Sequence, residues 1–264
     1  MNRRPLARTF WVAALVSALS GAAAQTQSRY PLRNVIAVGD RQLNDTTGEV
    51  SLTLTARSGN QEAPPIESTT RDREKYVEEV LAVQGNTVTR LRQQYLAART
   101  FTTDPAGHHV LEPSSLDGKT LTIERKDGKV VISPASAKIS AEDRKTLSQA
   151  LDAIRIPFLP EREAAIGEEW TVTASQVQTL FPQARAGTMQ ARFEEVMPYA
   201  GRECAHVRLT GEIELAVEGI PAPVKAELTG DLYHALDIQH PVALQFAGPL
   251  SVDAQIKQAG VPSR

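Results

Sequence analysis

Alternation of apolar and polar residues dominates the last third of the chain. Over residues 205–217 every second residue is apolar or glycine, and the residues between them are mostly polar. The same pattern returns over 224–232 and 242–256, and a shorter run at 189–194 precedes it. A period of two is typical of β-strands with one buried face. The pattern therefore predicts four consecutive antiparallel strands, a meander.

Three glycines lie on the apolar side of these alternating segments: Gly211, Gly230 and Gly248. With turns near positions 220 and 239, Gly211 faces Gly230 and Gly230 faces Gly248. A row of missing side chains marks a place where a sheet creases or where another group packs close to the backbone. We call this predicted row the glycine crease.

The N-terminal half is less regular. Residues 50–56 alternate and predict a half-buried strand, whereas 58–70 contain glycines and prolines and predict a loop. A helix face could consist of Tyr76, Val77, Val80 and Leu81, but we interpret 75–83 and 86–98 as two strands joined by a turn, because they are rich in β-branched residues. A long connection is expected over 102–115, where proline and glycine recur.

The middle of the chain carries the clearest local signals. Asp127 and Gly128 separate two apolar runs and predict a tight hairpin, because both residues tolerate positive φ angles. Ser140, followed by two acidic residues, predicts a helix N-terminus. The apolar face of this helix consists of Leu147, Ala150, Leu151 and Ile154. A second short helix is expected over 175–180.

These elements predict an α+β fold: a curved antiparallel sheet, an open or half barrel built on the long-stranded meander and packed on the one main helix. A closed barrel and two packed sheets stay open as alternatives. We expect residues 25–264 to form a single domain, in which 25–70 is a loosely ordered N-terminal segment.

The first 24 residues have the pattern of a secretory signal peptide. Arg3, Arg4 and Arg8 precede an apolar run at 10–16, and three alanines precede Gln25. We therefore expect an exported protein, periplasmic or extracellular. After removal of the signal peptide no segment is apolar enough to span a membrane.

Composition excludes several classes of protein. Cys204 is the only cysteine, so a scaffold held by intramolecular disulfides is excluded. Without the three arginines of the signal peptide, 26 basic residues stand against 31 acidic ones, a net charge of −5. This balance does not favour binding to nucleic acid.

Short motifs of the central region resemble an uncharacterised family of exported bacterial domains. Phe158-Leu159-Pro160-Glu161 followed by 165–170 is similar to its "LP then V-G-D-x-W" junction, although Glu168 and Glu169 stand where Gly-Asp or Gly-Glu is expected. Residues 116–120 and 126–129 are similar to its "L-x-G-K" and "DGK" hairpin segments. The resemblance implies export and fold, but no activity. The meander also resembles the half barrels of periplasmic lipoprotein carriers at the level of architecture.

No specific catalytic motif occurs. His108 and His109 lack further ligands at metal-site spacing, so we predict no metal and no cofactor. His206 falls on the polar side of its strand, and Cys204 lacks a clear activating partner. His234 is the exception, because it continues the apolar side of 224–232 and is expected to pair with Val207 and Leu244.

The leading hypothesis is a non-enzymatic exported domain that binds an apolar small molecule on the glycine crease. Its predicted ligand-binding residues are Gly211, Gly230, Gly248, Leu228, Leu232, His234 and Phe246. Alternatively, the helix fills this face, no cavity is left, and the protein is a structural module that binds another envelope protein. A hydrolase ranks third, because no motif supports it.

Overall fold

Antiparallel β-sheets form most of the protein in its computed structural model, and within the described residues there are two helices, α1 (Ala141–Ala153) and α2 (Ala174–Leu180). The sheets do not close into a barrel. The structure describes residues 28–54, 57–58, 61–62, 66–85, 87–104, 106–154, 156–216 and 222–252. The predicted signal peptide lies outside these residues, as does the predicted turn near position 220. No helix in the described part of the chain is long and apolar enough to cross a membrane.

One six-stranded sheet comes from the N-terminal half. Its strands are β2 (Arg41–Leu54), β5 (Ile66–Gln84), β6 (Thr87–Thr103), β7 (His109–Pro113), β8 (Thr120–Lys126) and β9 (Lys129–Ser133). The order is β2-β5-β6-β8-β9, and β7 also pairs with β6. Two predicted connections were partly wrong, because 66–70 belongs to β5 and 109–113 forms β7. The predicted hairpin is confirmed: Asp127 and Gly128 have φ angles of 50° and 76° between β8 and β9.

The second six-stranded sheet comes from the C-terminal half. Its strands are β11 (Glu169–Val172), β12 (Ala184–Tyr199), β13 (Arg202–Leu215), β14 (Val224–Ala235), β15 (His240–Ala247) and β16 (Leu250–Val252). The order β11-β12-β13-β14-β15 confirms the predicted meander. Its last predicted strand, 242–256, is broken: β15 ends at Ala247, and β16 pairs with the first residues of β14, whereas 253–256 lie outside the described residues. Two minor sheets join β1 (Arg29–Leu32) to β10 (Arg162–Ala165) and β3 (Arg57–Ser58) to β4 (Gln61–Glu62).

Each large sheet packs its own helix and has its own core. Helix α1 begins at the predicted cap, where the Ser140 side chain accepts a hydrogen bond from the Asp143 amide. Its residues Leu147 and Leu151 are buried against β6 and β8, in the N-terminal sheet. The prediction that this helix covers the meander was therefore wrong. Helix α2, close to the predicted range, packs on β12 instead.

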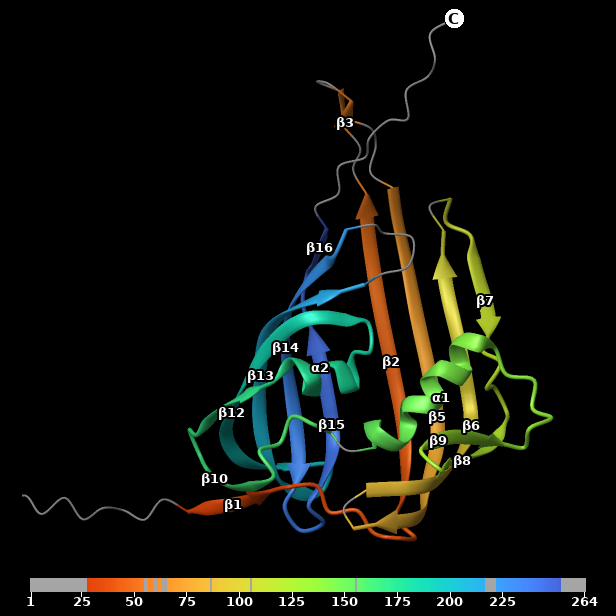
Figure 1. Cartoon of the computed structure of the whole chain (residues 1–264). Helices are drawn as coiled ribbons and strands as arrows, with labels where there is room; N and C mark the ends of the chain where they lie inside the picture. Colours follow the sequence, from red (N-terminus) through yellow and green to blue (C-terminus); the bar gives the residue numbers. More distant parts are fainter. Residues whose placement is uncertain are drawn as a thin grey trace, which may run out of the picture.

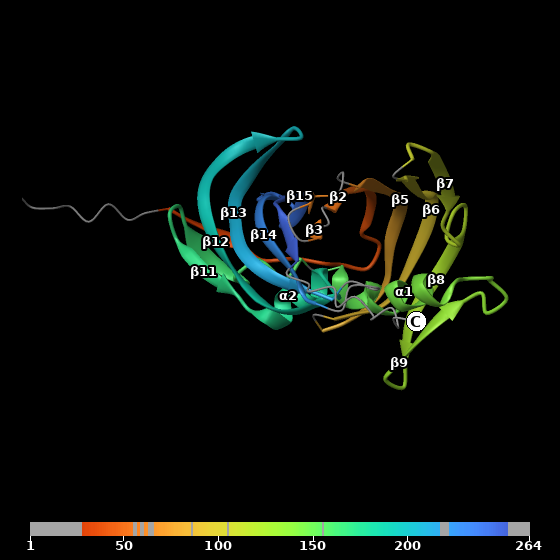
Figure 2. The same ribbon diagram turned by 90° about the horizontal axis from the view of Figure 1, so that it is seen from above.

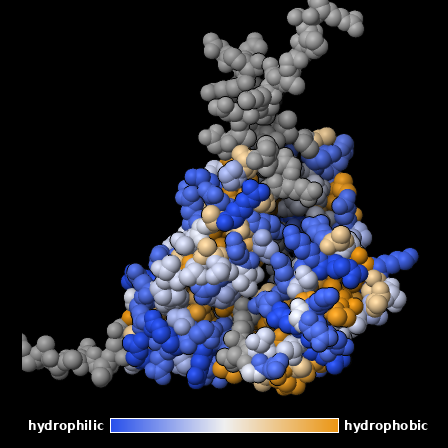
Figure 3. All heavy atoms as spheres, viewed as in Figure 1, coloured by the Kyte–Doolittle hydropathy of each residue, from blue (hydrophilic) through white to orange (hydrophobic). Residues whose placement is uncertain are grey.

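The two sheets meet edge to edge. Figures 1 and 2 show β2 beside β15, with both helices on the same side of the molecule. Figure 2 also shows the C-terminal strands bending around one side. We call the line between β2 and β15 the seam. The strands do not pair there, but the Val35 amide donates to the Gln239 carbonyl at 3.0 Å. Seen from the helix side, hydrophilic and hydrophobic residues are interspersed on the surface (Figure 3).

Candidate functional site

The glycine crease differs from its predicted register. Gly211 pairs with Leu228, and Gly230 lies between Leu209 and Phe246, so the three glycines do not face one another. Both predicted registers are two residues off. One reason is that β14 and β15 turn around residues 236–239 and carry a bulge after Tyr233. A slip of two residues keeps each side chain on its face, so the sheet still has an apolar inner side.

Side chains and backbone fill the space beside the glycines. A Cβ atom at Gly230 would overlap the ring of Phe246, and one at Gly248 would overlap the Glu227 carbonyl. At Gly211 a Cβ would lie 2.5 Å from the Thr188 carbonyl oxygen. The glycines therefore allow close packing.

An aromatic cluster covers the inner side at this point. The Phe246 ring packs edge-on against Phe158 and Phe181, with ring centroids 5.8 and 5.3 Å away. Of the other predicted residues, Leu232 is buried and Leu228 is half-buried against the same core. The structure thus brings Gly230, Leu228, Leu232 and Phe246 together in a packed region.

His234 is the most unusual of the predicted residues. It pairs with Ala205 and Pro241 rather than with Val207 and Leu244. Its exposed fraction is 0%, and neither ring nitrogen has a hydrogen-bond partner in the described part of the chain. Burial, with a contribution from His240, lowers the pKa of His234 to about 4. The ring is therefore neutral at physiological pH.

The other candidates lie apart from one another. His108 contacts Asp104 at 2.9 Å in an exposed loop, and Nε2 of His206 lies 2.8 Å from Asp231. Cys204 is buried, which raises the pKa of its thiol. Among the described residues, no group of three or more His, Cys, Asp or Glu side chains is arranged to hold a metal ion.

A cavity of about 400 Å³ lies at the seam. The N-terminal sheet, the end of α1 and the start of β15 all contribute to its wall. Its apolar lining includes Val35, Ile36, Leu43, Val80, Ile154, Ile238, Pro241 and Val242. Its polar lining consists of Asp40, Arg41, Gln42, Asn44, Glu78 and His240. None of the predicted ligand-binding residues lines this cavity.

A chain of hydrogen bonds runs from the seam into the N-terminal sheet. Nε2 of His240 donates to Oε1 of Gln42 at 2.5 Å, and Nε2 of Gln42 donates to Oε1 of Glu78 at 2.9 Å. The second Glu78 oxygen accepts from Nε2 of Gln93 at 2.7 Å. The Tyr95 hydroxyl then donates to Gln93 at 3.1 Å. These contacts hold the Glu78 carboxyl in place at the cavity wall.

Glu78 is a buried acid that has no ion-pair partner among the described residues. Its exposed fraction is 4%, and burial raises its pKa although the two glutamine amides oppose that effect. Glu74, four residues before it on the same face of β5, also has a raised pKa, because it is partly buried and lies near Asp143 and Asp72. Within the described residues none of these four carboxyls forms an ion pair with lysine or arginine.

Asn44 leaves a buried donor unused. It follows Gln42 on the same face of β2 and lines the seam cavity. Its Nδ2 atom is buried and has no hydrogen-bond partner in the described part of the chain. Buried amide groups are nearly always paired, so an unpaired one beside a cavity calls for an explanation.

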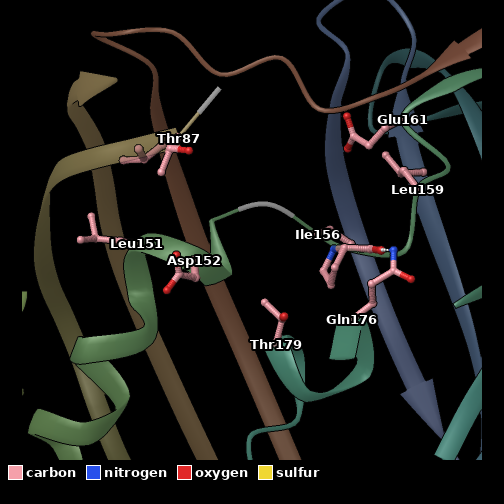
Figure 4. Close-up of a pocket in the computed structure, with 10 residues that line it drawn as sticks. Thr87, Leu151, Asp152, Ile156, Leu159, Glu161, Gln176 and Thr179 are labelled. Carbon is pink, nitrogen blue, oxygen red and sulfur yellow. Dashed lines mark hydrogen bonds between the residues drawn. The ribbon is translucent and has the colours of Figure 1, made fainter. Parts of the chain in front are cut away.

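A second cavity, of about 330 Å³, lies between the two helices. Figure 4 shows Thr87, Leu151 and Asp152 on one side of it and Ile156, Leu159, Glu161, Gln176 and Thr179 on the other. Nε2 of Gln176 donates to the Pro157 carbonyl at 2.7 Å and so ties α2 to the segment after α1. Ile154 lines the first cavity and Ile156 the second, so both cavities flank the segment that leads from one half to the other.

Sequence reasoning missed the seam for a specific reason. Glu78 alternates with Tyr76 and Val80, so an acid on an apolar face was a visible signal. The alternation did not identify the buried side of the strand, because Val77 and Leu81, on the other side, are apolar as well. The seam also depends on which strand edges meet, and no local pattern encodes that.

Comparison of the chain with protein-family models, curated proteins and solved structures found no match.

Proposed function

We propose that this protein is an exported, non-enzymatic binding protein that holds an apolar small molecule at the seam between its two sheets. The observation that supports the proposal is the cavity of about 400 Å³, which falls within the size range of small-molecule sites, about 300–1,000 Å³. Such sites are mostly apolar, with a few polar groups in fixed positions. The lining of the seam cavity has this composition.

The architecture suits such a role. We propose that the two unclosed sheets act as the walls of an open half barrel, with α1 and α2 on its inner side. Within the described residues, β2 and β15 do not pair as strands of one sheet, so the walls can separate at lower cost than paired strands can. The proposed export rests on the signal-peptide pattern of residues 1–24, and it places the site in the periplasm or outside the cell.

A fluorescence titration tests the proposal. We expect N-phenyl-1-naphthylamine, an apolar dye, to bind the purified protein saturably and to be displaced by alkyl-chain ligands. The variant Val242→Trp fills the cavity from β15 and should weaken dye binding at least tenfold. Val131→Trp is the matched control, because Val131 is 40% exposed on β9 and does not line the cavity.

Two results would contradict the proposal. One is the absence of saturable binding, which would favour a structural module that binds another protein. The other is equal dye affinity in Val242→Trp and the unmodified protein, when both unfold at the same denaturant concentration. That result would place the dye elsewhere.

A further inference from the structure

We propose that the ligand ends in an uncharged group that both donates and accepts a hydrogen bond, such as the hydroxyl of a long-chain alcohol, and that Glu78 and Asn44 hold this group. The inference rests on the proposed function, because it assumes that the seam cavity is the binding site. It adds the chemistry of the ligand's polar end.

Asn44 requires an acceptor. Its Nδ2 atom can only donate, is buried and has no partner in the described part of the chain. A ligand oxygen in the cavity would accept this bond once the Asn44 side chain turns toward it, because the Nδ2 atom is closed to solvent in the unliganded protein. An alkyl chain alone would leave the donor unpaired, at a cost in free energy.

Glu78 requires a donor. Each of its oxygens already accepts one hydrogen bond, from Gln42 or from Gln93, and a carboxylate oxygen can accept a second. An O–H or N–H group on the ligand would use that capacity. Glu78 pairs with Gln42 across the strands and Asn44 pairs with Tyr76, so Glu78 and Asn44 are diagonal neighbours. Diagonal neighbours lie about 7–8 Å apart, so one small group can bridge the ends of their side chains.

Hydrogen-bonding capacity disfavours the two ionic alternatives. The lining carries both signs of charge, Arg41 beside Asp40 and Glu78, so charge alone does not select the ligand. A ligand carboxylate could accept from the Asn44 amide, but it offers no donor to Glu78. An alkylammonium ion could donate to Glu78, but it has no acceptor for the Asn44 amide. A hydroxyl satisfies both residues.

A competition series at pH 7 tests the inference. The series measures how well four ligands displace the dye from the unmodified protein and from two variants. The ligands share one alkyl chain and differ in the end group: 1-decanol, decyl methyl ether, decanoate and decylammonium. We expect decanol to bind at least tenfold more tightly than each of the other three. Asn44→Leu should remove most of that preference while dye binding is kept. Asn44→Asp replaces the amide donor by an acid. This variant should bind decanol more weakly and decylammonium more tightly than the unmodified protein does.

Gln94→Leu is the matched control, because Gln94 is an exposed polar residue of β6 that does not line the cavity. It should leave the order of affinities unchanged. If decanoate or decylammonium binds as tightly as decanol, or if both Asn44 variants keep the preference, the inference is wrong while the proposed function stands. If no ligand displaces the dye, the proposed function itself fails.

Discussion

The two halves of the molecule differ in how their inner faces are filled. In the C-terminal half the inner face is largely apolar, and Phe246 closes the gap that Gly230 leaves. In the N-terminal half, amides and carboxyls such as Gln42 and Glu78 interrupt the apolar face next to a cavity. Regular alternation thus marks a filled core, and interrupted alternation lies beside a cavity.

The two faces of β5 show the same contrast within one strand. On the outer face, Lys75 lies 2.9 Å from Asp45, and Glu79 forms an ion pair with Arg92. On the inner face, Glu74 and Glu78 form no ion pair with a lysine or arginine of the described residues. Exposed ion pairs contribute little to stability, but a buried acid without a cation is costly. A cost of this kind is typical of a binding site rather than of a packed core.

Filling the glycine crease should have the largest effect. Gly230→Leu places a side chain where the Phe246 ring and the Gln245 carbonyl already lie. In a denaturant titration we expect the free energy of unfolding to fall by about 3 kcal/mol, the upper end of the usual cost of overpacking a core. Near-normal stability with loss of dye binding would instead show a ligand space at the crease, and would reverse the contrast between the halves.

His234 should contribute to acid sensitivity. Its pKa is about 4 in the fold against 6.5 for the free side chain, so the unfolded chain takes up the proton first as pH falls. Between pH 6.5 and 4 the protein should lose about 3 kcal/mol of stability through this one group. His234→Leu should remove that loss, whereas His108→Leu, in an exposed loop, should keep it. Equal acid dependence in His234→Leu and the unmodified protein, measured by urea unfolding at several pH values, would contradict this assignment.

Glu78 should act in the opposite direction. Because its pKa is raised in the fold, the folded protein holds this proton more tightly than the unfolded chain does, and stability falls as pH rises above about 4.5. At pH 4, Glu78→Gln should therefore change the free energy of unfolding by no more than about 1 kcal/mol. As pH rises toward 7, the variant should become more stable relative to the unmodified protein. Glu79→Gln, on the outer face, is the control for removing a carboxyl. A constant difference between pH 4 and 7 would mean that Glu78 is not held in a buried site.

The smallest effect is expected at Gly48 in β2, the counterpart of Gly230 in the N-terminal sheet. No atom lies within 4 Å of a Cβ built there, and its φ angle is not positive. Gly48→Ala should raise the free energy of unfolding by about 0.4–1 kcal/mol, because it restricts the unfolded chain. Thermal unfolding measures this, and destabilisation would show that the N-terminal sheet is packed at Gly48 as closely as the C-terminal sheet is at Gly230.

Local structure was largely predictable from the sequence. The meander, the Asp127-Gly128 hairpin and the Ser140 cap depend on residues close in the chain, and all three were predicted. The sheet against which α1 packs was not predicted correctly. An apolar stripe with Leu147 and Leu151 shows that one side of a helix is buried, but it does not show which sheet covers that side. The register was missed because the turn before His240 is centred earlier than expected.

The candidate site was far less predictable. The predicted residues around Gly230 share a regular pattern, and that pattern marked a packed core. Glu78, Gln42 and His240 come together only because the edges of β2 and β15 meet. The positions of such edges follow from the packing of the whole chain.

Photolabelling can locate a bound alkyl alcohol within the protein. An alkyl alcohol with a diazirine at its tail should, on irradiation with the protein, label residues of the seam cavity, in the segments 35–44 and 238–242 and at Ile154. Excess decanol should prevent this labelling. Labels concentrated on 228–232 and 246 would instead place the ligand on the glycine crease and contradict the account.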